Sequence, residues 1–293
     1  MHSGRVITPV FDSTGMAINF FKATAASIVN QDCQNFEWIV SVQFGTVPWY
    51  LDFLKSLKIS NLTIRTSKAT TLQDHLNELL HMRNNADWTH ILCQDDFYLR
   101  RFSTHDIEKA LTRSDVVILR PDSRCGQDTQ LRSLMSEKLG RTKLFLSTVP
   151  VNRIGGLSTL AWRSKDMEPL KCAYSLLADV DLIDQLRQKN SSFVVLLGIL
   201  AEAHWSGQAQ FALSSNQESE FSQWVRAHPS SRCNASLSAI AADIYGYRNL
   251  GDAWEGSAGI LISPLRRLSR FLGRVRSSWY RLSSLTKTAG NKS

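Results

Sequence analysis

The sequence lacks an apolar stretch long enough to cross a membrane. Its longest apolar run, residues 193–201, is soon interrupted by Glu202 and His204, whereas a membrane-spanning helix needs about 20 apolar residues. The amino terminus also lacks the apolar stretch of a secretory signal and leads directly into a predicted strand. We therefore expect a cytoplasmic protein.

Paired cysteines are missing as well. The chain has five cysteines, an odd number, and none of them forms a CxxC pair: Cys33, Cys93, Cys125, Cys172 and Cys233. This pattern argues against a disulfide framework and against a zinc site, and it favours a reducing compartment.

Acidic residues are absent after Glu255, where eight basic residues occur. Subtracting those eight from 34 Lys and Arg leaves 26, which equals the 26 Asp and Glu, so residues 1–255 are formally neutral. The net charge of +8 therefore belongs to the end of the chain. A neutral body makes nucleic acid an unexpected partner.

The same basic end has a helical pattern. Its apolar residues recur at spacings of three and four: Leu265, Leu268, Leu272, Val275, Trp279 and Leu282. Most of its arginines fall on the opposite face of a helix, among them Arg266, Arg267, Arg270 and Arg274. A cationic amphipathic helix with Trp279 in its apolar stripe predicts binding to the anionic inner face of the cell membrane. The alternative is a helix that docks on the body of the protein or on a partner.

The remainder of the chain reads as an α/β protein. Short apolar strands are predicted at 5–11, 36–42, 62–65, 89–93, 116–120, 155–163 and 193–197. Helices are predicted at 17–30, 48–57, 72–82 and 176–189. This alternation is typical of a mostly parallel sheet covered by helices on both faces. We expect one domain over 1–210, a helical extension over 211–263 and the basic amphipathic tail over 264–293.

Two adjacent carboxylates, Asp95 and Asp96, follow the predicted strand at 89–93. Ligands bind at the carboxyl ends of strands in α/β proteins, and carboxylate oxygens suit Mg²⁺ or Mn²⁺. The pair therefore predicts a metal that holds a nucleotide diphosphate. The alternative is a turn at the end of the strand in which one Asp caps the following loop.

Several stretches, in order along the chain, resemble the family 2 glycosyltransferases of GT-A fold, which transfer a sugar from a nucleotide-sugar donor. Residues 6–11 (VITPVF) are similar to the opening nucleotide-binding strand, and residues 27–31 and 36–40 (SIVNQ, FEWIV) to the family's SVLNQ and FEWIIV signatures. Residues 94–99 (QDDFYL) stand at the DxD element, and residues 152–158 to Arg163 resemble the acceptor-side IGxPS to FRR strand. Residues 177–182 and His204 with Gln208 are set against EDxDLW and HxxxQ.

The resemblance implies a role for each matching residue. Asp179 would be the catalytic base, with inversion of the anomeric configuration, although an Asp in the first turn of a helix also suits the helix dipole. Asp95 would bind Mn²⁺ or Mg²⁺ with Asp96 beside it, and His204 would complete the metal site or be a satisfied polar residue. The donor site would include Thr8, Pro9, Phe11 and Gln43, and the acceptor side Gly156, Ser158 and Arg163.

Some positions differ from the family pattern. Residues 42–45 (VQFG) stand where the family has Asp-Asp-Gly-Ser, Cys93 replaces the first Asp of DxD, and Ala178 replaces the Glu before the base. The predicted function is a glycosyltransferase that uses a UDP- or dTDP-sugar and a glycan or lipid-linked acceptor in polysaccharide biosynthesis. The alternative is a catalytically silent GT-A relative that binds a glycan or scaffolds a biosynthetic complex.

Overall fold

The computed structural model describes residues 3–82, 85–121, 156–164, 170–175, 178–189 and 192–202, together with Gln223 and Ala227. The described segments up to residue 202 belong to one compact unit, which comprises residues 1–147 and 152–209. The predicted helical extension at 211–263 and the tail at 264–293 lie outside the described residues, apart from Gln223 and Ala227.

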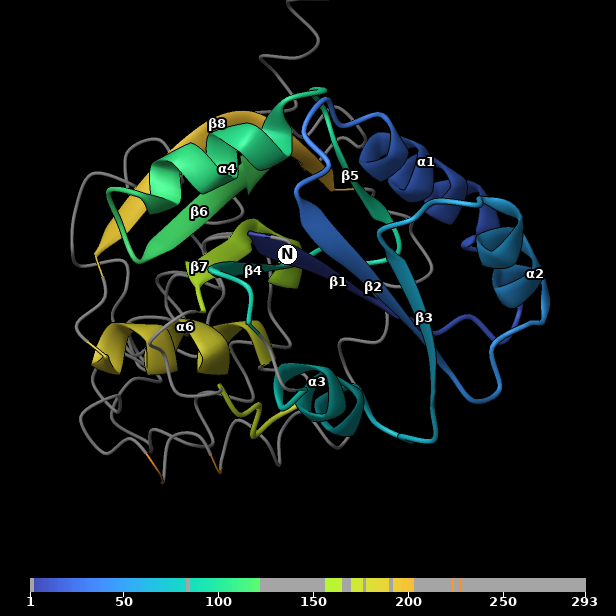
Figure 1. Ribbon diagram of the computed structural model, residues 1–293. Coiled ribbons are helices and arrows are strands. Elements are labelled where there is room, and N and C mark those ends of the chain that lie inside the picture. Colours follow the sequence, from blue (N-terminus) through green and yellow to red (C-terminus); the bar gives the residue numbers. More distant parts are fainter. Residues whose placement is uncertain are drawn as a thin grey trace, which may run out of the picture. The chain divides into compact units, whose positions relative to one another are not determined.

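The unit is built on one eight-stranded sheet with the order β3-β2-β1-β4-β7-β6-β8-β5 (Figure 1). The strands are β1 (Gly4–Val10), β2 (Phe36–Gln43), β3 (Leu62–Ser67), β4 (Trp88–Ile91), β5 (Asp96–Tyr98), β6 (Val116–Pro121), β7 (Leu160–Arg163) and β8 (Phe193–Glu202). The first four strands are mutually parallel, and β6 is parallel to β8. β7 and β5 run antiparallel to their neighbours. The mostly parallel α/β sheet predicted from the sequence is confirmed, and the structure adds the two antiparallel strands.

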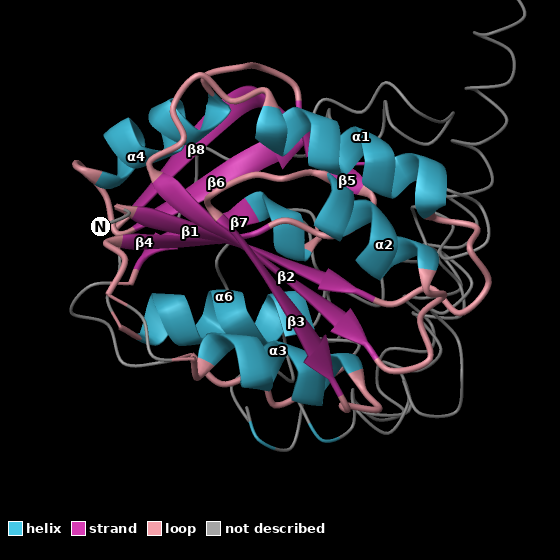
Figure 2. Ribbon diagram, turned by 45° about the vertical axis from the view of Figure 1, so that its right-hand side comes forward, coloured by secondary structure: helices cyan, strands magenta, loops and turns pink. Residues whose placement is uncertain are grey.

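Helices cover both faces of the sheet, as Figure 2 shows with α1, α2 and α4 on one side and α3 and α6 on the other. They are α1 (Ile18–Val29), α2 (Trp49–Ser56), α3 (Leu72–Leu80), α4 (Ser103–Leu111) and α6 (Ala178–Gln188). The larger core packs Phe21, Tyr50 and Ile107 of the first group against Trp38 on β2. The central strands β1, β2 and β4 are therefore buried on both faces, which is why their sequences are predominantly apolar rather than alternating.

The second core lies under α3 and α6. Leu76 and Leu80 of α3 and Leu182 of α6 pack there with Ile91 of β4 and Trp162 of β7. The leucine spacing in the predicted helix at 72–82 therefore marks the buried face correctly at Leu76, Leu79 and Leu80. Leu72, predicted on the same face, is 39% exposed because it lies at the start of the helix. Thr71 begins α3, and its hydroxyl accepts a hydrogen bond from the backbone N–H of Asp74 at 3.1 Å, a favourable N-cap.

The sequence did not predict β5 or α4. Strand β5 has three residues and exists because it pairs with β8, Asp96 opposite Glu202 and Tyr98 opposite Leu200. The buried side of α4 includes Ser103 and Thr104 beside its two apolar residues, so its hydrophobic spacing is incomplete. The predicted strand at 155–163 begins instead with a 3-10 turn, η2 (Leu157–Thr159), before β7.

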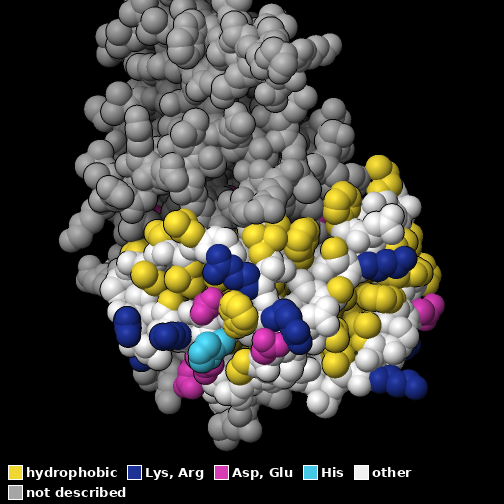
Figure 3. Space-filling view, turned by 90° about the horizontal axis from the view of Figure 1, so that it is seen from above, with side chains coloured by type: hydrophobic (Ala, Val, Ile, Leu, Met, Phe, Trp, Pro, Cys, Tyr) yellow, Lys and Arg dark blue, Asp and Glu magenta, His cyan; other side chains and the backbone are white. Residues whose placement is uncertain are grey.

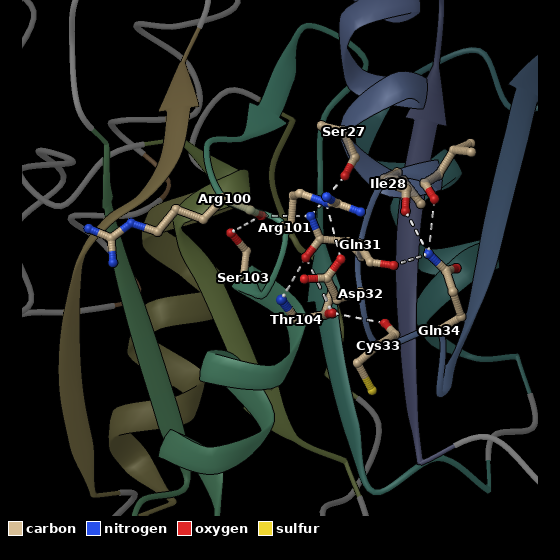
Figure 4. A network of polar contacts seen from close by, with 11 residues as sticks. Ser27, Ile28, Gln31, Asp32, Cys33, Gln34, Arg100, Arg101, Ser103 and Thr104 are labelled. Carbon is tan, nitrogen blue, oxygen red and sulfur yellow. Dashed lines mark hydrogen bonds and ion pairs between the residues drawn. The ribbon is translucent and has the colours of Figure 1, made fainter.

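Gln31 joins the end of α1 to the start of α4 (Figure 4). Its amide nitrogen donates to the carbonyl oxygens of Ser27 and Arg100, both at 2.8 Å. Its amide oxygen accepts from the backbone N–H of Thr104 at 3.0 Å. Ser27 also binds β5, because its hydroxyl accepts the N–H of Tyr98 at 3.1 Å. The SIVNQ stretch therefore has a structural role that connects α1 to the chain after the acidic pair.

The face seen in Figure 3 carries acidic and basic side chains interspersed among apolar ones on the described part of the chain. Within the described residues, no helix has both the length and the apolar character that a membrane crossing requires.

Candidate functional site

The carboxyl ends of β1 and β4 meet at one edge of the sheet because these strands are parallel neighbours. Beyond the strands the backbone of Leu92 still bonds to Ile7, N to O at 2.8 Å. Gln94 then continues the pairing with its side chain: its Oε1 accepts the N–H of Phe11 at 2.9 Å, and its Nε2 donates to the Phe11 carbonyl at 3.0 Å. Phe11 and the turn that carries Asp95 are thus held side by side. The sequence predicted both residues in one donor site, but not the role of Gln94 in joining them.

Asp12 and Tyr50 also belong to this edge, and neither was predicted from the sequence to do so. The carboxylate of Asp12 accepts the hydroxyl of Tyr50 at 2.7 Å and the backbone N–H groups of Gly15 and Ala17, each at 2.8 Å. Burial disfavours ionisation of Asp12, but these hydrogen bonds outweigh it and lower its pKa. An anionic Asp12 therefore organises the loop between β1 and α1. The signal in the sequence was Asp-Ser-Thr-Gly, which favours an Asx-type turn.

Asp95 lies within electrostatic range of Tyr50. Burial chiefly raises the pKa of the Tyr50 hydroxyl, and its hydrogen bond to Asp12 and the charges of Asp12 and Asp95 raise it further. Two carboxylates from different strand ends thus act on one phenol. The edge is an acidic site.

Asp95 and Asp96 differ in exposure. Asp95 is half-buried in the turn, whereas Asp96 begins β5 and is buried. Among the described residues no three His, Cys, Asp or Glu side chains gather as a group that could hold a metal ion, and His204 lies outside them. One or two carboxylates are nonetheless the protein's usual share of a Mg²⁺ site, in which phosphates and water supply the other oxygens. Asp95 fits that donor set.

Gln43 ends β2 at the same edge. Its Nε2 donates to the carbonyl oxygen of Ala69 at 2.6 Å and so fixes the amide orientation. No hydrogen bond in the described part of the chain uses its Oε1. The group that remains is a hydrogen-bond acceptor.

Thr8 and Pro9 are both buried within β1. The hydroxyl of Thr8 accepts the indole N–H of Trp38 at 3.0 Å, inside the larger core. The Thr8 side chain therefore points into the core. A contribution of Thr8 to the donor site stays a prediction. Phe11 follows the strand and is 45% exposed, so its ring remains available to a ligand.

Arg163 does not lie at this edge. Since β7 runs antiparallel to β4, Arg163 pairs with Trp88, the first residue of β4, and Ala161 pairs with His90. Its guanidinium is 3.8 Å from the carboxylate of Asp115, just before β6. The antiparallel direction thus places Arg163 at the opposite end of the sheet from Asp95, and its role on the acceptor side stays a prediction.

Ser158 and His90 lie beneath the acidic turn and are both fully buried. The Ser158 hydroxyl accepts the N–H of Cys93 at 2.7 Å, and its carbonyl oxygen lies 2.7 Å from His90 Nε2. A carbonyl only accepts, so Nε2 carries the hydrogen and Nδ1 accepts the Tyr98 hydroxyl at 2.6 Å. Burial lowers the pKa of His90 to about 4, so the ring is neutral at pH 7. The Ser158 side chain therefore contacts the acidic turn from inside the fold. Gly156, which was predicted on the acceptor side together with Ser158, is exposed.

Asp179 lies in the first turn of α6 and is half-buried, with its Oδ1 accepting the N–H of Val180 at 2.7 Å. Its neighbour Asp181 is buried and accepts the N–H of Ala173 at 2.6 Å. That contact fixes the segment before α6, which α3 also holds: Asn77 receives the N–H of Cys172 at 2.7 Å and donates to its carbonyl at 2.8 Å. The two carboxylates thus have different surroundings, as expected from their positions on a helix.

No protein-family model matches this sequence, and no curated protein matches it. Solved structures do match. The S. aureus TarS fragment 1–349 in complex with UDP-GlcNAc is 15% identical, with a TM-score of 0.60 over 92% of this chain and 79% of that one. The same fragment in complex with UDP gives 14% and 0.53 over 94% and 91%. The mannosyltransferase PcManGT from Pyrobaculum calidifontis, in complex with GDP-Man and Mn²⁺, gives 12% and 0.55 over 98% and 79%. The chain shares the GT-A-like fold of these proteins.

Proposed function

We propose that the chain is a glycosyltransferase of GT-A type that transfers a sugar from a nucleotide-diphosphate sugar to a glycan or a lipid-linked acceptor. The observation that carries the proposal is the convergence of Phe11, Asp12, Gln94 and Asp95 at the carboxyl edge of the sheet, held by the Gln94–Phe11 hydrogen bonds. Ligands of α/β proteins bind at this edge. The two solved structures of the same fold that carry UDP-GlcNAc and GDP-Man support a donor of this class.

A pyrimidine base suits the donor end of the proposed site. Uracil and thymine each present an N–H donor at N3, and the Oε1 of Gln43 is an oriented acceptor. The exposed ring of Phe11 offers a stacking surface beside the carboxyl end of β1. We therefore propose a UDP- or dTDP-sugar as the donor.

Asp95 is the residue that would hold Mg²⁺ or Mn²⁺ together with the donor diphosphate, and His204 is the proposed further ligand. When bound, the metal would stabilise the negative charge that develops on the leaving diphosphate. Asp12 does not compete for this role, because its carboxylate already accepts hydrogen bonds from Tyr50 and from the loop before α1.

Asp179 is the proposed general base. Its carboxylate would take the proton of an acceptor hydroxyl while that oxygen attacks the anomeric carbon. The bond from this carbon to the diphosphate breaks on the opposite side, so the nucleoside diphosphate leaves and the configuration inverts. In the structure the Asp179 Oδ1 accepts the N–H of Val180 at 2.7 Å, in the first turn of α6.

Binding and donor hydrolysis test this proposal. We expect Mn²⁺-dependent binding of UDP, and release of UDP from at least one of a panel of UDP- and dTDP-sugars. Asp95→Asn should weaken Mn²⁺-dependent UDP binding at least about tenfold, because a charged hydrogen-bond or metal ligand contributes about 1.5–3 kcal/mol. The matched control is Asp52→Asn, an exposed carboxylate on α2, which should bind as the wild type does.

The catalytic role of Asp179 separates an enzyme from a silent relative. Asp179→Asn should retain UDP binding and lose turnover. Binding without turnover of any donor in the wild type, unaffected by Asp179→Asn, would instead support the glycan-binding or scaffold alternative, which the replacements Cys93 and Ala178 motivate.

The basic end of the chain is proposed to bind the anionic inner face of the cell membrane, which would make the protein peripheral. The support is the sequence pattern of Arg266, Arg267, Arg270, Arg274 and Trp279. Deletion of residues 264–293 should abolish co-sedimentation with anionic vesicles and leave the far-UV circular dichroism of the remaining chain native-like. Undiminished sedimentation of the truncated chain would refute this part of the proposal.

A further inference from the structure

The acidic turn is closed at its base by two side chains. His90 on β4 and Tyr98 on β5 stand before and after it, and His90 Nδ1 lies 2.6 Å from the Tyr98 hydroxyl. Both side chains are buried, His90 fully and Tyr98 at 4% exposure. The intervening residues, which include Asp95, therefore form a loop whose ends are held together by a buried hydrogen bond.

Ser158 attaches to the same loop at two points. Its carbonyl oxygen accepts His90 Nε2–H at 2.7 Å, and its hydroxyl accepts the backbone N–H of Cys93 at 2.7 Å. Ser158 belongs to η2, more than 60 residues further along the chain. One buried residue thus binds both the base of the loop and the residue two positions before Asp95.

The other flank of the turn is fixed from the opposite direction. The side-chain amide of Gln94 forms two hydrogen bonds with the backbone of Phe11, one through its oxygen and one through its nitrogen. The backbone carbonyl oxygen of Gln94 accepts the Thr24 hydroxyl of α1 at 2.9 Å. Ser158 therefore holds the turn on the side of β7, and the hydrogen bonds to Gln94 hold it on the side of β1. Two consecutive residues before Asp95 have their backbone held by side chains from different elements.

We propose that Ser158 and His90 are positioning residues that hold the acidic turn, before ligand arrives, in the conformation in which Asp95 meets a metal–nucleotide diphosphate. This role rests on the proposed function. Without the Ser158 hydroxyl, the part-buried backbone N–H of Cys93 loses this acceptor, and the turn is no longer held to η2 at that point. Binding then includes the cost of restoring one conformation, so the affinity falls although neither residue touches the ligand.

The test measures two quantities on the full chain. The first is amide hydrogen exchange of the peptide that covers residues 91–97, without ligand. The second is the dissociation constant of UDP in the presence of Mn²⁺. In Ser158→Ala we expect exchange in this peptide to accelerate about tenfold and affinity to fall about tenfold, the equivalent of about 1.4 kcal/mol for one lost buried hydrogen bond.

Two further variants separate positioning from general stability. Ser103→Ala is the matched control, since Ser103, at the start of α4, is also a fully buried serine. Its hydroxyl donates to the Arg100 carbonyl at 2.9 Å. This control variant should lower the melting temperature as Ser158→Ala does and leave UDP affinity within about twofold. Tyr98→Phe removes only the hydroxyl that binds His90, so it is the gentler variant if Ser158→Ala folds poorly, and it should shift both readouts in the same direction by a smaller factor.

Each outcome bears on the role. Faster exchange at 91–97 together with weaker UDP binding in Ser158→Ala and Tyr98→Phe, but not in Ser103→Ala, supports it. A wild type that binds UDP with Mn²⁺, and variants that bind it equally well, would overturn the positioning role alone. Equal weakening in Ser103→Ala would overturn it too, since the effect would then be one of stability. A wild type that binds no nucleotide at all overturns the proposed function, and this role with it.

Discussion

Acidification should destabilise the folded protein through His90. The ring is fully buried, and burial lowers its pKa from 6.5 to about 4 despite the hydrogen bond to the Ser158 carbonyl. Between these two values the unfolded chain binds a proton at this histidine and the folded protein does not. The free energy of unfolding therefore rises with pH across this range and falls as the solution is acidified.

The magnitude follows from the two pKa values. Integrated from pH 7 to pH 5, the proton linkage of one such histidine removes about 1.8 kcal/mol of stability. The limit, reached below pH 4, is about 3.4 kcal/mol for a shift of about 2.5 pH units. His75 adds a contribution of the same sign, because burial lowers its pKa too. The wild type alone therefore does not isolate His90.

Urea unfolding at pH 7 and pH 5 of the wild type and of His90→Gln isolates it. Glutamine can donate to the Ser158 carbonyl but does not titrate, so the loss of stability on acidification should be smaller in the variant by about 1.8 kcal/mol. His105→Gln is the control, because His105 is exposed on α4, and it should behave as the wild type. The same pH difference in wild type and His90→Gln, within about 0.5 kcal/mol, would refute the neutral buried ring.

Three further substitutions test contacts elsewhere. Gln31→Ala should lower the free energy of unfolding by about 2–4 kcal/mol in urea titrations, because its buried amide joins α1 to α4 through hydrogen bonds at both ends. Arg163→Gln should leave UDP affinity within about twofold and stability within about 1 kcal/mol, since its ion pair with Asp115 is partly exposed and lies at the far end of the sheet. Gly4→Ala should lower the free energy of unfolding by about 1–3 kcal/mol and so lower the melting temperature, because an added Cβ would lie 2.0 Å from the Trp88 ring.

Local patterns in the sequence sufficed for most of the elements. The strands around Ile7, Ile39 and Ile91 are predominantly apolar because both of their faces are buried. The helix that presents Leu76 and Leu80 to the core shows the spacing of three to four residues that this packing requires. Such patterns reflect only burial and period, which each segment carries in itself.

The site depended on pairings that no local pattern contains. β5 is a strand only because Asp96 lies opposite Glu202. Arg163 lies at the opposite end of the sheet from Asp95 because β7 runs antiparallel to β4, and the composition of four residues does not encode that direction. Ser158 reaches the acidic turn through contacts that span 65 and 68 positions of the chain.

By itself, then, the sequence determined an α/β fold and placed an acidic pair after a buried strand, because hydrophobic period and the position of charge relative to it are properties of neighbouring residues. Only the tertiary structure decided which side chains serve that pair. In the tertiary structure Gln94 forms hydrogen bonds with Phe11, Tyr50 with Asp12, and the buried hydroxyl of Ser158 with the backbone N–H of Cys93. The physical reason is that a buried polar group must find its partner wherever the sheet order and strand direction bring one.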